Sequence, residues 1–319
     1  MLYRILLYVF LPTLLFSREV HIKEIPLKGL ITNPKQEISG MDWYGDHLFL
    51  LPENLGGFLF MIPKSEIQNS IKSLKPKPIQ PKKIDFITPN YLDAIAGFDG
   101  FEAIAFYKNI VLISIEAENN GSMNGYIAWG RINPKTLKVN VPDKNIKKIN
   151  TPIQIDNMSF ESILVNKNEA IMIYEANGAN LHKNLTHPTL SLSDFTLRKI
   201  SAPMIEYRIT DATKVYKNKF WTINYYWSGD KKKLNPAKDK ISEKYPKRGS
   251  HRRVETVERL IEFEIKKDKI KLSDVAPIQL YLEDGAARNW EAICRFNKNS
   301  FLIATDKHPR MILGYVKAH

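Results

Sequence analysis

Cysteine is almost absent from this chain. Cys294 is the only one among 319 residues, so no intramolecular disulfide can form and the fold must be held together by its core. The alternation of apolar and polar residues around Cys294 points it inward, which favours a buried small hydrophobe over a nucleophile. A phosphate loop, a dinucleotide fingerprint, a nucleophile elbow and a His-rich metal motif are also missing, and the enzyme classes that they define are excluded.

Long apolar runs are missing too, except at the start. Residues 5–16 are mostly apolar, follow Arg4 and precede the charged Arg18 and Glu19. This run is too short to span a bilayer and is typical of a secretory signal peptide, with cleavage near Ser17; an uncleaved anchor or a misplaced start is the alternative. We therefore predict a signal peptide over residues 1–17, a single domain over residues 18–319 without a transmembrane span, and a secreted or periplasmic location. Because no cysteine lies near the junction, a bacterial lipoprotein anchor is not supported.

Negative charge is in deficit, since the formal net charge is +13. The stretch 230–253 holds ten Lys or Arg against three Asp or Glu and so supplies +7 of it. Pro236, Pro246 and Gly249 and the lack of apolar periodicity predict a long surface insertion. The insertion could bind an anionic or protein partner, but we favour a solvated loop, because a charge run alone specifies little. No nucleic-acid partner is expected.

One short phrase recurs five times, which indicates a repeat architecture. Most copies open with an apolar residue. Each copy then has an acid or hydroxyl residue, a small residue, a polar break and an apolar run, and most copies end in a second acid. The distance between the two polar positions is 14 residues in each of the first three copies, 39–53, 102–116 and 161–175. The copies begin at Ile38-Ser39-Gly40, Phe101-Glu102-Ala103, Phe160-Glu161-Ser162, Thr210-Asp211-Ala212 and Trp290-Glu291-Ala292.

Two further strand-like segments follow each of the first four copies, and one follows the last. The alternating segment 20–27 has no copy of its own and can supply the missing strand. We predict an all-β fold: a five-bladed β-propeller of four-stranded antiparallel blades, closed by the N-terminal strand, which removes exposed sheet edges. Six blades are the alternative, because 80 residues separate Asp211 from Glu291.

The first polar residue of each copy is expected to face the central channel. The residue that follows it is small in all five copies, as crowding near an axis requires. Carboxylates gathered there raise one another's pKa, and a hard cation resolves the conflict. Ligation by oxygen alone favours one Ca²⁺ on the central axis over zinc. The predicted ligands are Ser39, Glu102, Glu161, Asp211 and Glu291. In the alternative, these residues bond backbone amides of neighbouring blades or line a channel without metal.

The second acid of each copy is expected at one rim of the channel, where a ligand would bind. Glu53, Glu116, Glu175 and Asp306 are the candidate catalytic residues. Lys307, His308, Asn177 and Asn224 are candidate contacts for a small anionic substrate. The alternative is that the residues following these strands were selected for turn geometry.

The chain resembles two families of propellers. The segment from Glu37 to Trp43 is similar to the first blade of the calcium-activated nucleotidases (apyrases), five-bladed propellers with one central Ca²⁺ held in the order Ser, Glu, Glu, Ser, Glu; Asp211 replaces one serine here. The segment Gly100 to Ile104 is similar to the phytase-like (esterase-like) propeller domain. Where apyrases carry Asp-Asp-Arg-Thr-Gly, this chain reads Glu53-Asn54-Leu55-Gly56-Gly57, and an acidic rim would repel phosphate.

The resemblance implies a Ca²⁺-dependent hydrolase of phosphoester or related bonds, in which a rim acid acts as general base. The alternative is a non-catalytic binding or scaffold propeller with a structural central ion. A lactonase-type propeller is a third option, although that type uses six blades and Asn ligands.

Overall fold

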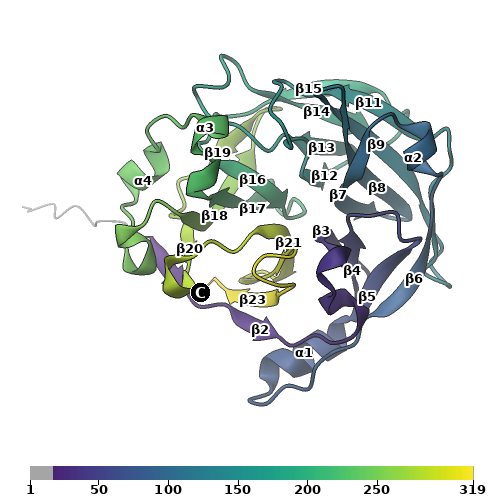
Figure 1. Cartoon of the computed structure of the whole chain (residues 1–319), viewed down its shortest axis with the longest axis horizontal. Helices are drawn as coiled ribbons and strands as arrows, with labels where there is room; N and C mark the ends of the chain where they lie inside the picture. The colour runs from purple at the N-terminus through teal and green to yellow at the C-terminus, as the bar shows by residue number, and fades with distance from the viewer. Residues whose placement is uncertain (1–16, 319) are drawn as a thin grey trace, which may run out of the picture.

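The computed structural model describes residues 17–318, and β-strands dominate it (Figure 1). The prediction of an all-β fold is confirmed. The predicted signal peptide lies, except for Ser17, outside the described residues and stays a prediction, as does the assignment of residues 18–319 to a single domain. Across residues 17–318, every helix falls short of the length and hydrophobicity that a membrane crossing requires.

Within residues 17–318, hydrogen bonds group the strands into four sheets, the largest of which has nine strands and two meanders. The first meander is β3 (Ile38–Tyr44), β4 (His47–Pro52), β5 (Phe58–Pro63) and β6 (Lys82–Ile87). The second is β7 (Phe98–Tyr107), β8 (Ile110–Asn119) and β9 (Ser122–Ile132), with β10 (Val139–Asn140) and β11 (Ile146–Asn150) both paired to β9. The parallel pairing of β6 with β10 joins the two meanders.

The other sheets have four, six and four strands. One is β12 (Ser162–Asn166), β13 (Glu169–Ile173), β14 (Thr186–Ser191) and β15 (Leu197–Ser201). The next is β16 (Arg208–Ala212), β17 (Lys219–Tyr226), β18 (Val257–Ile265), β19 (Ile270–Leu272), β20 (Ile278–Leu280) and β1 (Arg18–Val20). The last is β21 (Trp290–Asn297), β22 (Ser300–Thr305), β23 (Leu313–Lys317) and β2 (Lys23–Ile25).

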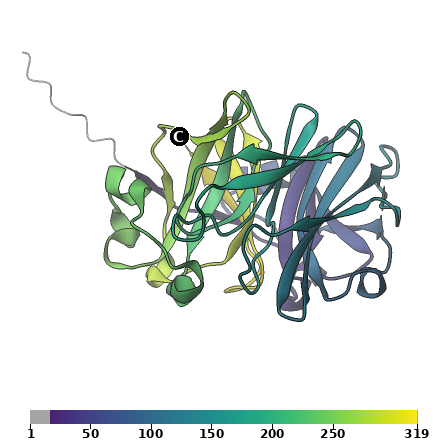
Figure 2. The same ribbon diagram turned by 90° about the horizontal axis from the view of Figure 1, so that it is seen from above.

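The first strand of each meander lies innermost, and these strands close a ring. β3 contacts β7 and β21, while β12 contacts β7 and β16, and β16 contacts β21. Figure 1 shows the sheets arranged around this ring, and Figure 2 shows the flattened shape of the whole. The strands approach closely: a Cβ added to Gly40 of β3 would lie 3.0 Å from the backbone nitrogen of Ile104 in β7. This crowding explains the small residues of the repeated phrase.

The N-terminal segment closes the ring. β2 pairs antiparallel with β23, with Lys23 opposite Tyr315 and Ile25 opposite Leu313. The predicted strand over residues 20–27 is nevertheless divided, because β1 pairs in parallel with β20 of the neighbouring sheet. The N-terminus therefore joins two adjacent sheets rather than one.

Short helices occupy the connections. They are α1 (Lys64–Lys72), α2 (Tyr91–Ala94), α3 (Lys231–Leu234) and α4 (Lys240–Lys244), with the 3-10 helices η1 (Leu30–Thr32), η2 (Pro34–Gln36), η3 (Ser228–Asp230), η4 (Gly249–Arg253) and η5 (Glu283–Gly285). The basic insertion 230–253 thus contains α3, α4 and η4. Its apolar residues Leu234, Ile241 and Tyr245 are buried, which fixes it against the sheets.

The core consists of apolar clusters between neighbouring sheets. In one of them, Phe49 and Leu51 of β4 pack with Phe101 of β7 and Ile113 of β8. Cys294 of β21 is buried among apolar residues, as its sequence context predicted. Each inner strand is thereby held from both sides, so its central polar residues have fixed positions.

Candidate functional site

A cluster of glutamates lies where the inner strands meet. Burial raises the pKa of Glu102 well above its ordinary value, and the negative charges of Glu116, Glu53, Glu291 and Glu175 raise it further. Burial likewise raises the pKa of Glu161, and the negative charges of Glu175, Glu102 and Glu291 raise it further. The structure therefore brings three predicted channel residues, Glu102, Glu161 and Glu291, together with three predicted rim acids.

Arg208, at the start of β16, supplies a positive charge to this cluster. Its Nε donates to Glu175 Oε1, its Nη2 lies 3.5 Å from Glu291 Oε1, and its Nη1 lies 4.0 Å from Asp230 Oδ2. Only 14% of its side chain is exposed, and Glu175 is fully buried. These carboxylates raise the pKa of Arg208 against the effect of burial, so the guanidinium stays charged.

The two remaining predicted channel residues bond the backbone instead. Ser39 Oγ donates to Phe101 O at 2.5 Å. The Asp211 carboxylate accepts from the amides of Ala212 and Ile293, both at 2.7 Å. Asp is one methylene shorter than Glu, so its carboxylate reaches adjacent amides rather than the axis. This is the arrangement named above as the alternative to metal ligation.

The fourth copy of the phrase is displaced by one residue in the structure. Register shifts fall at Ser39, Glu102 and Glu291 in β3, β7 and β21, but at Thr210 in β16. Thr210 Oγ1 donates to Trp290 O at 2.5 Å, which mirrors the bond from Ser39 to Phe101. Thr210, rather than Asp211, is therefore the structural counterpart of Ser39.

Glu53 is one of a pair of interacting carboxyl groups. Burial, followed by the hydrogen bond and the charge of Glu37, raises the pKa of Glu53 to about 9. Glu37 receives Lys307 Nζ at 2.8 Å, and this bond and that with Glu53 hold its pKa below the ordinary value although burial acts to raise it. Glu53 is thus protonated and Glu37 ionised at neutral pH. Lys307 is engaged by Glu37 and does not line the cavity described below.

The Glu53 side chain lies directly over Gly100. A Cβ at position 100 would lie 2.6 Å from Glu53 Cγ, so we expect Gly100→Ala to reduce the free energy of unfolding by about 1–3 kcal/mol through overpacking. Urea denaturation measures this loss. Because Glu53→Ala removes the obstructing Cγ, the double variant should recover part of it. If the double variant instead loses the sum of the two single losses, the steric explanation is contradicted.

Glu116 and Asp306 occupy different surroundings. Burial and the charge of Glu175 raise the pKa of Glu116 to about 8. The Asp306 carboxylate accepts from the His308 amide at 2.8 Å and from Asn289 Nδ2 at 3.0 Å. Asp306 therefore acts on the site through Asn289 and His308 rather than by facing the cavity.

The two predicted asparagine contacts have structural roles. Asn177 and Asn224 are both fully buried. Asn177 Nδ2 donates to Tyr174 O at 2.6 Å, and Asn224 Nδ2 donates to Glu206 O and Arg208 O, each at 3.0 Å. Asn224 thereby fixes the backbone that carries Arg208, while Asn177 Oδ1 is buried without a hydrogen-bond partner among residues 17–318.

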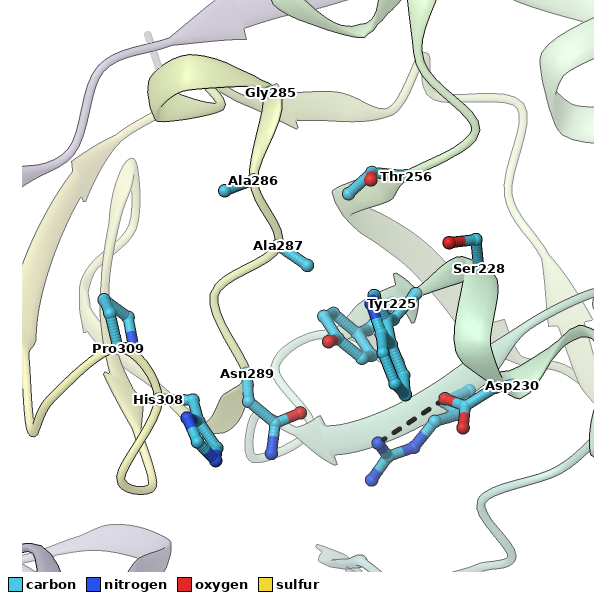
Figure 3. A pocket seen from close by; sticks show the side chains of 12 residues that line it. Tyr225, Ser228, Asp230, Thr256, Gly285, Ala286, Ala287, Asn289, His308 and Pro309 are labelled. Carbon is cyan, nitrogen blue, oxygen red and sulfur yellow. Dashed lines mark ion pairs between the residues drawn. The ribbon is translucent and has the colours of Figure 1, made fainter.

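A cavity of about 730 Å³ opens beside Arg208. Asn289 and His308 lie on one side of it and Ser228 and Asp230 on the other, with Tyr225 between them (Figure 3). Trp227 also lines it and is 53% exposed, although most tryptophans are buried. His308 is the only predicted ligand contact among the residues that line this cavity.

Three buried carboxyl oxygens of the cluster lack a protein partner. Among the described residues, no donor reaches Oε2 of Glu116, Glu175 or Glu291. Burial raises the pKa of Glu291 to about 7, with Arg208 opposing the rise and Asp306 adding to it. The site thus combines unpaired acceptors with carboxyl groups that exchange protons near neutral pH.

The calcium ion stays a prediction. Within residues 17–318, no group of three or more His, Cys, Asp or Glu has the arrangement of a metal site. Arg208 already places a positive charge between Glu175 and Glu291, and the carboxylate of Asp211 is committed to amides. The five predicted residues therefore do not form one donor set for the ion. We derive no chemical step through it.

Sequence reasoning missed several residues that line the cavity, although His308 was among the predicted contacts. Arg208 stands three positions before Asp211, and Asp99 stands three positions before Glu102. A comparison of these offset positions would have shown a charge close to the channel residue. Asp230 and Asn289 lie outside the aligned positions of the phrase, so they carried no such signal.

Comparisons with known proteins give likenesses of fold alone. No family model matches the chain, and no curated protein matches it. A structure from the GH130 family of mannoside phosphorylases, which contains glycoside hydrolases that target β-1,2 mannosidic linkages in Candida mannan, has a TM-score of 0.51 at 10% identity, covering 96% of this chain and 95% of that one. An α-L-arabinanase mutant from Cellvibrio cellulosa has a TM-score of 0.48 at 12% identity, covering 88% and 90%.

These neighbours correct two predictions. The chain was expected to resemble apyrases and the phytase-like domain, but the structure that it resembles at a TM-score of 0.51 comes from the GH130 family. The prediction of a Ca²⁺-dependent phosphoester hydrolase is overturned together with this resemblance, and so is the alternative of a scaffold with a structural ion. The physical reason is that the cation near these acids, Arg208, is already paired with Glu175 and Glu291 and is not available to bind a phosphate.

Proposed function

We propose that this protein is a glycoside hydrolase that acts at the channel mouth of a five-bladed propeller. Each of the five inner strands is taken as the start of one blade, with the paired edge of β6 and β10 as a contact between two blades. The fold likeness to the GH130 structure supports this reading. A fold alone does not specify an activity, so the proposal rests on the chemistry of the site.

The observation that carries the proposal is the lining of the cavity beside Arg208, where Asp230, Ser228 and Asn289 present oxygen atoms. A carboxylate only accepts hydrogen bonds. A sugar presents many hydroxyl donors and therefore complements such a wall, whereas a phosphate presents acceptors and negative charge. The exposed face of Trp227 adds an apolar surface at the cavity wall, which suits the apolar face of a sugar ring.

Two carboxyl groups near Arg208 can perform the reaction. Glu291 lies behind the residues that line the cavity, 3.5 Å from Arg208 Nη2. With a pKa of about 7, it is protonated in a large fraction of molecules near neutral pH and can donate a proton to the leaving oxygen through a water molecule. Asp230 lines the cavity on the other side of the same guanidinium and can activate water or attack the sugar. Asp306 raises the pKa of Glu291 and is a positioning residue. Glu116 is the second candidate for the acid.

Export is part of the same proposal. Polymeric glycans lie outside the cell, and the predicted signal peptide over residues 1–17 would carry the chain to them. Substrates to be tested first are arabinan and β-1,2-mannan, which the names of the structural neighbours provide.

The test is hydrolysis of a glycan panel by the purified protein and by Glu291→Gln. We expect this substitution to lower kcat by about 10²–10⁴-fold with little change in KM, because it removes the transferable proton. Glu283→Gln, an exposed glutamate close to cavity residue Gly285, is the matched control and should retain full activity. The wild-type rate should fall as pH rises through about 7, the pKa of Glu291. If the rate falls at about pH 8 instead, the acid is Glu116 rather than Glu291. Absence of cleavage across the panel would overturn the proposal.

A further inference from the structure

We propose that the basic insertion, residues 230–253, binds the anionic groups of a glycan, and that the substrates of the cavity are glycans that carry carboxylate or sulfate groups on the units that extend past the cavity onto the insertion. This inference rests on the proposed function and extends it to specificity. It makes use of a segment that the glycosidase chemistry leaves unexplained.

The insertion leaves from the cavity wall and returns to it. Ser228 and Asp230 line the cavity where the insertion begins, and Thr256 lines it just after the insertion ends. Helix η4, at the end of the insertion, contacts η5, whose Gly285 also lines the cavity. A glycan chain with one unit in the cavity would therefore extend next to the insertion.

The acidic residues of the insertion are already neutralised. Asp230 lies 4.0 Å from Arg208, Asp239 lies 2.9 Å from Arg259, and Glu243 is paired with Lys238. By contrast, Lys232, Lys240, Arg252 and Arg253 are exposed, and no carboxylate among residues 17–318 lies within 4.0 Å of them. The insertion therefore presents an uncompensated positive surface, which attracts polyanions.

This surface is held in a fixed shape. Arg259 is fully buried and binds Asp239 with both terminal nitrogens, at 2.9 and 3.0 Å, and Asn224 with Nε at 2.8 Å. Glu19 accepts from the amide and hydroxyl of Ser250. A hollow of about 480 Å³ lined by Lys247, Arg248, Gly249 and Arg252 lies on the same insertion. A preorganised basic surface loses less entropy on binding than a flexible basic loop would.

The insertion favours a glycan over a nucleic acid. Single-stranded nucleic acids bind where basic grooves are combined with exposed aromatic rings on which bases stack. Tyr245 is the only aromatic residue of the insertion apart from His251, and both are buried. The exposed aromatic residue nearby, Trp227, lies on the cavity wall before the insertion begins, so the cations of the insertion can pair with charged groups but have no stacking platform among them.

Binding is tested with polygalacturonate, a uronate polymer, with neutral dextran, and with single-stranded DNA of equal charge. We expect polygalacturonate to bind with a Kd that rises at least tenfold between 50 and 200 mM NaCl, and dextran not to bind. The triple variant Lys232→Glu, Arg252→Glu, Arg253→Glu should weaken binding at least tenfold. The control triple variant Lys72→Glu, Lys75→Glu, Lys77→Glu makes the same charge change on exposed residues in and after α1, away from α3 and α4 (Figure 1), and should change Kd less than twofold. Circular dichroism verifies that both triple variants are folded.

Equal losses of affinity for polygalacturonate in the two triple variants would overturn the proposal, because binding would then depend on the net charge of the protein and not on the insertion. Tighter binding of DNA than of polygalacturonate would overturn the ligand class. Cleavage of neutral glycans with no binding of polygalacturonate would overturn the inference and leave the proposed hydrolase intact. Insertion-dependent binding of polygalacturonate without any cleavage would support the binding surface and count against the proposed hydrolase.

Discussion

Replacing Arg208 by methionine is expected to lower the free energy of unfolding by about 3–5 kcal/mol. The side chain is one of the few cations inside the glutamate cluster, and it touches Glu175, Glu291 and Asp230 at once. Methionine fills a comparable volume but leaves these carboxylates buried without a partner. For a chain of this size, a melting temperature lower by about 6–20 °C corresponds to that loss.

The mechanism can be separated from a general packing defect. A second substitution, Glu175→Gln, removes the charge that Arg208 neutralises most directly, so the double variant should be more stable than Arg208→Met alone. Arg208→Lys should recover little, because an ammonium cannot contact three carboxylates from one planar fork. Arg198→Met removes an exposed pair with Glu169 at 3.8 Å and should stay within about 0.5 kcal/mol of wild type. A loss below 1 kcal/mol in Arg208→Met would contradict the assigned role.

The fold was largely predictable because its signals are local and repeated. The phrase around Glu102, Glu161 and Glu291 marks inner strands, and the small residues mark their crowding. The parallel pair between β6 and β10 was not predictable, since two residues of β10 meet a strand some fifty residues earlier. The short helices of the insertion were missed because four or five helical residues leave no periodicity to detect.

The site was less predictable, for reasons of register and side-chain length. Alignment by sequence placed Asp211 beside Glu102 and Glu291, but the bulge in β16 falls one residue earlier, at Thr210. A one-residue shift moves a side chain to the other face of a strand. The cavity also depends on Trp227 and Asp230, which belong to connections whose positions only the tertiary structure determines.

The stability of this protein is expected to fall as pH rises from 6 to 9, although many proteins are near their most stable in part of this range. The pKa values of Glu291, Glu116 and Glu53 in the folded chain are about 7, 8 and 9, above the value of 4.5 expected when unfolded. Between these limits the folded state therefore holds more protons than the unfolded state. Each proton that the folded state holds in excess of the unfolded state lowers the free energy of unfolding by about 1.4 kcal/mol per pH unit.

Thermal melts at constant ionic strength between pH 5.5 and 9 measure this dependence. We expect the melting temperature to be at least about 5 °C lower at pH 9 than at pH 6, since 1 kcal/mol corresponds to roughly 2–4 °C in a chain of this length. The variant Glu53→Gln, Glu116→Gln removes two of the titrating groups and should flatten the curve. Glu169→Gln changes a partly exposed glutamate and should leave the slope unchanged. A melting temperature that is constant or rises toward pH 9 would show that the glutamate cluster is ionised in the folded protein, and the proton-donating role proposed for Glu291 would then lose its basis.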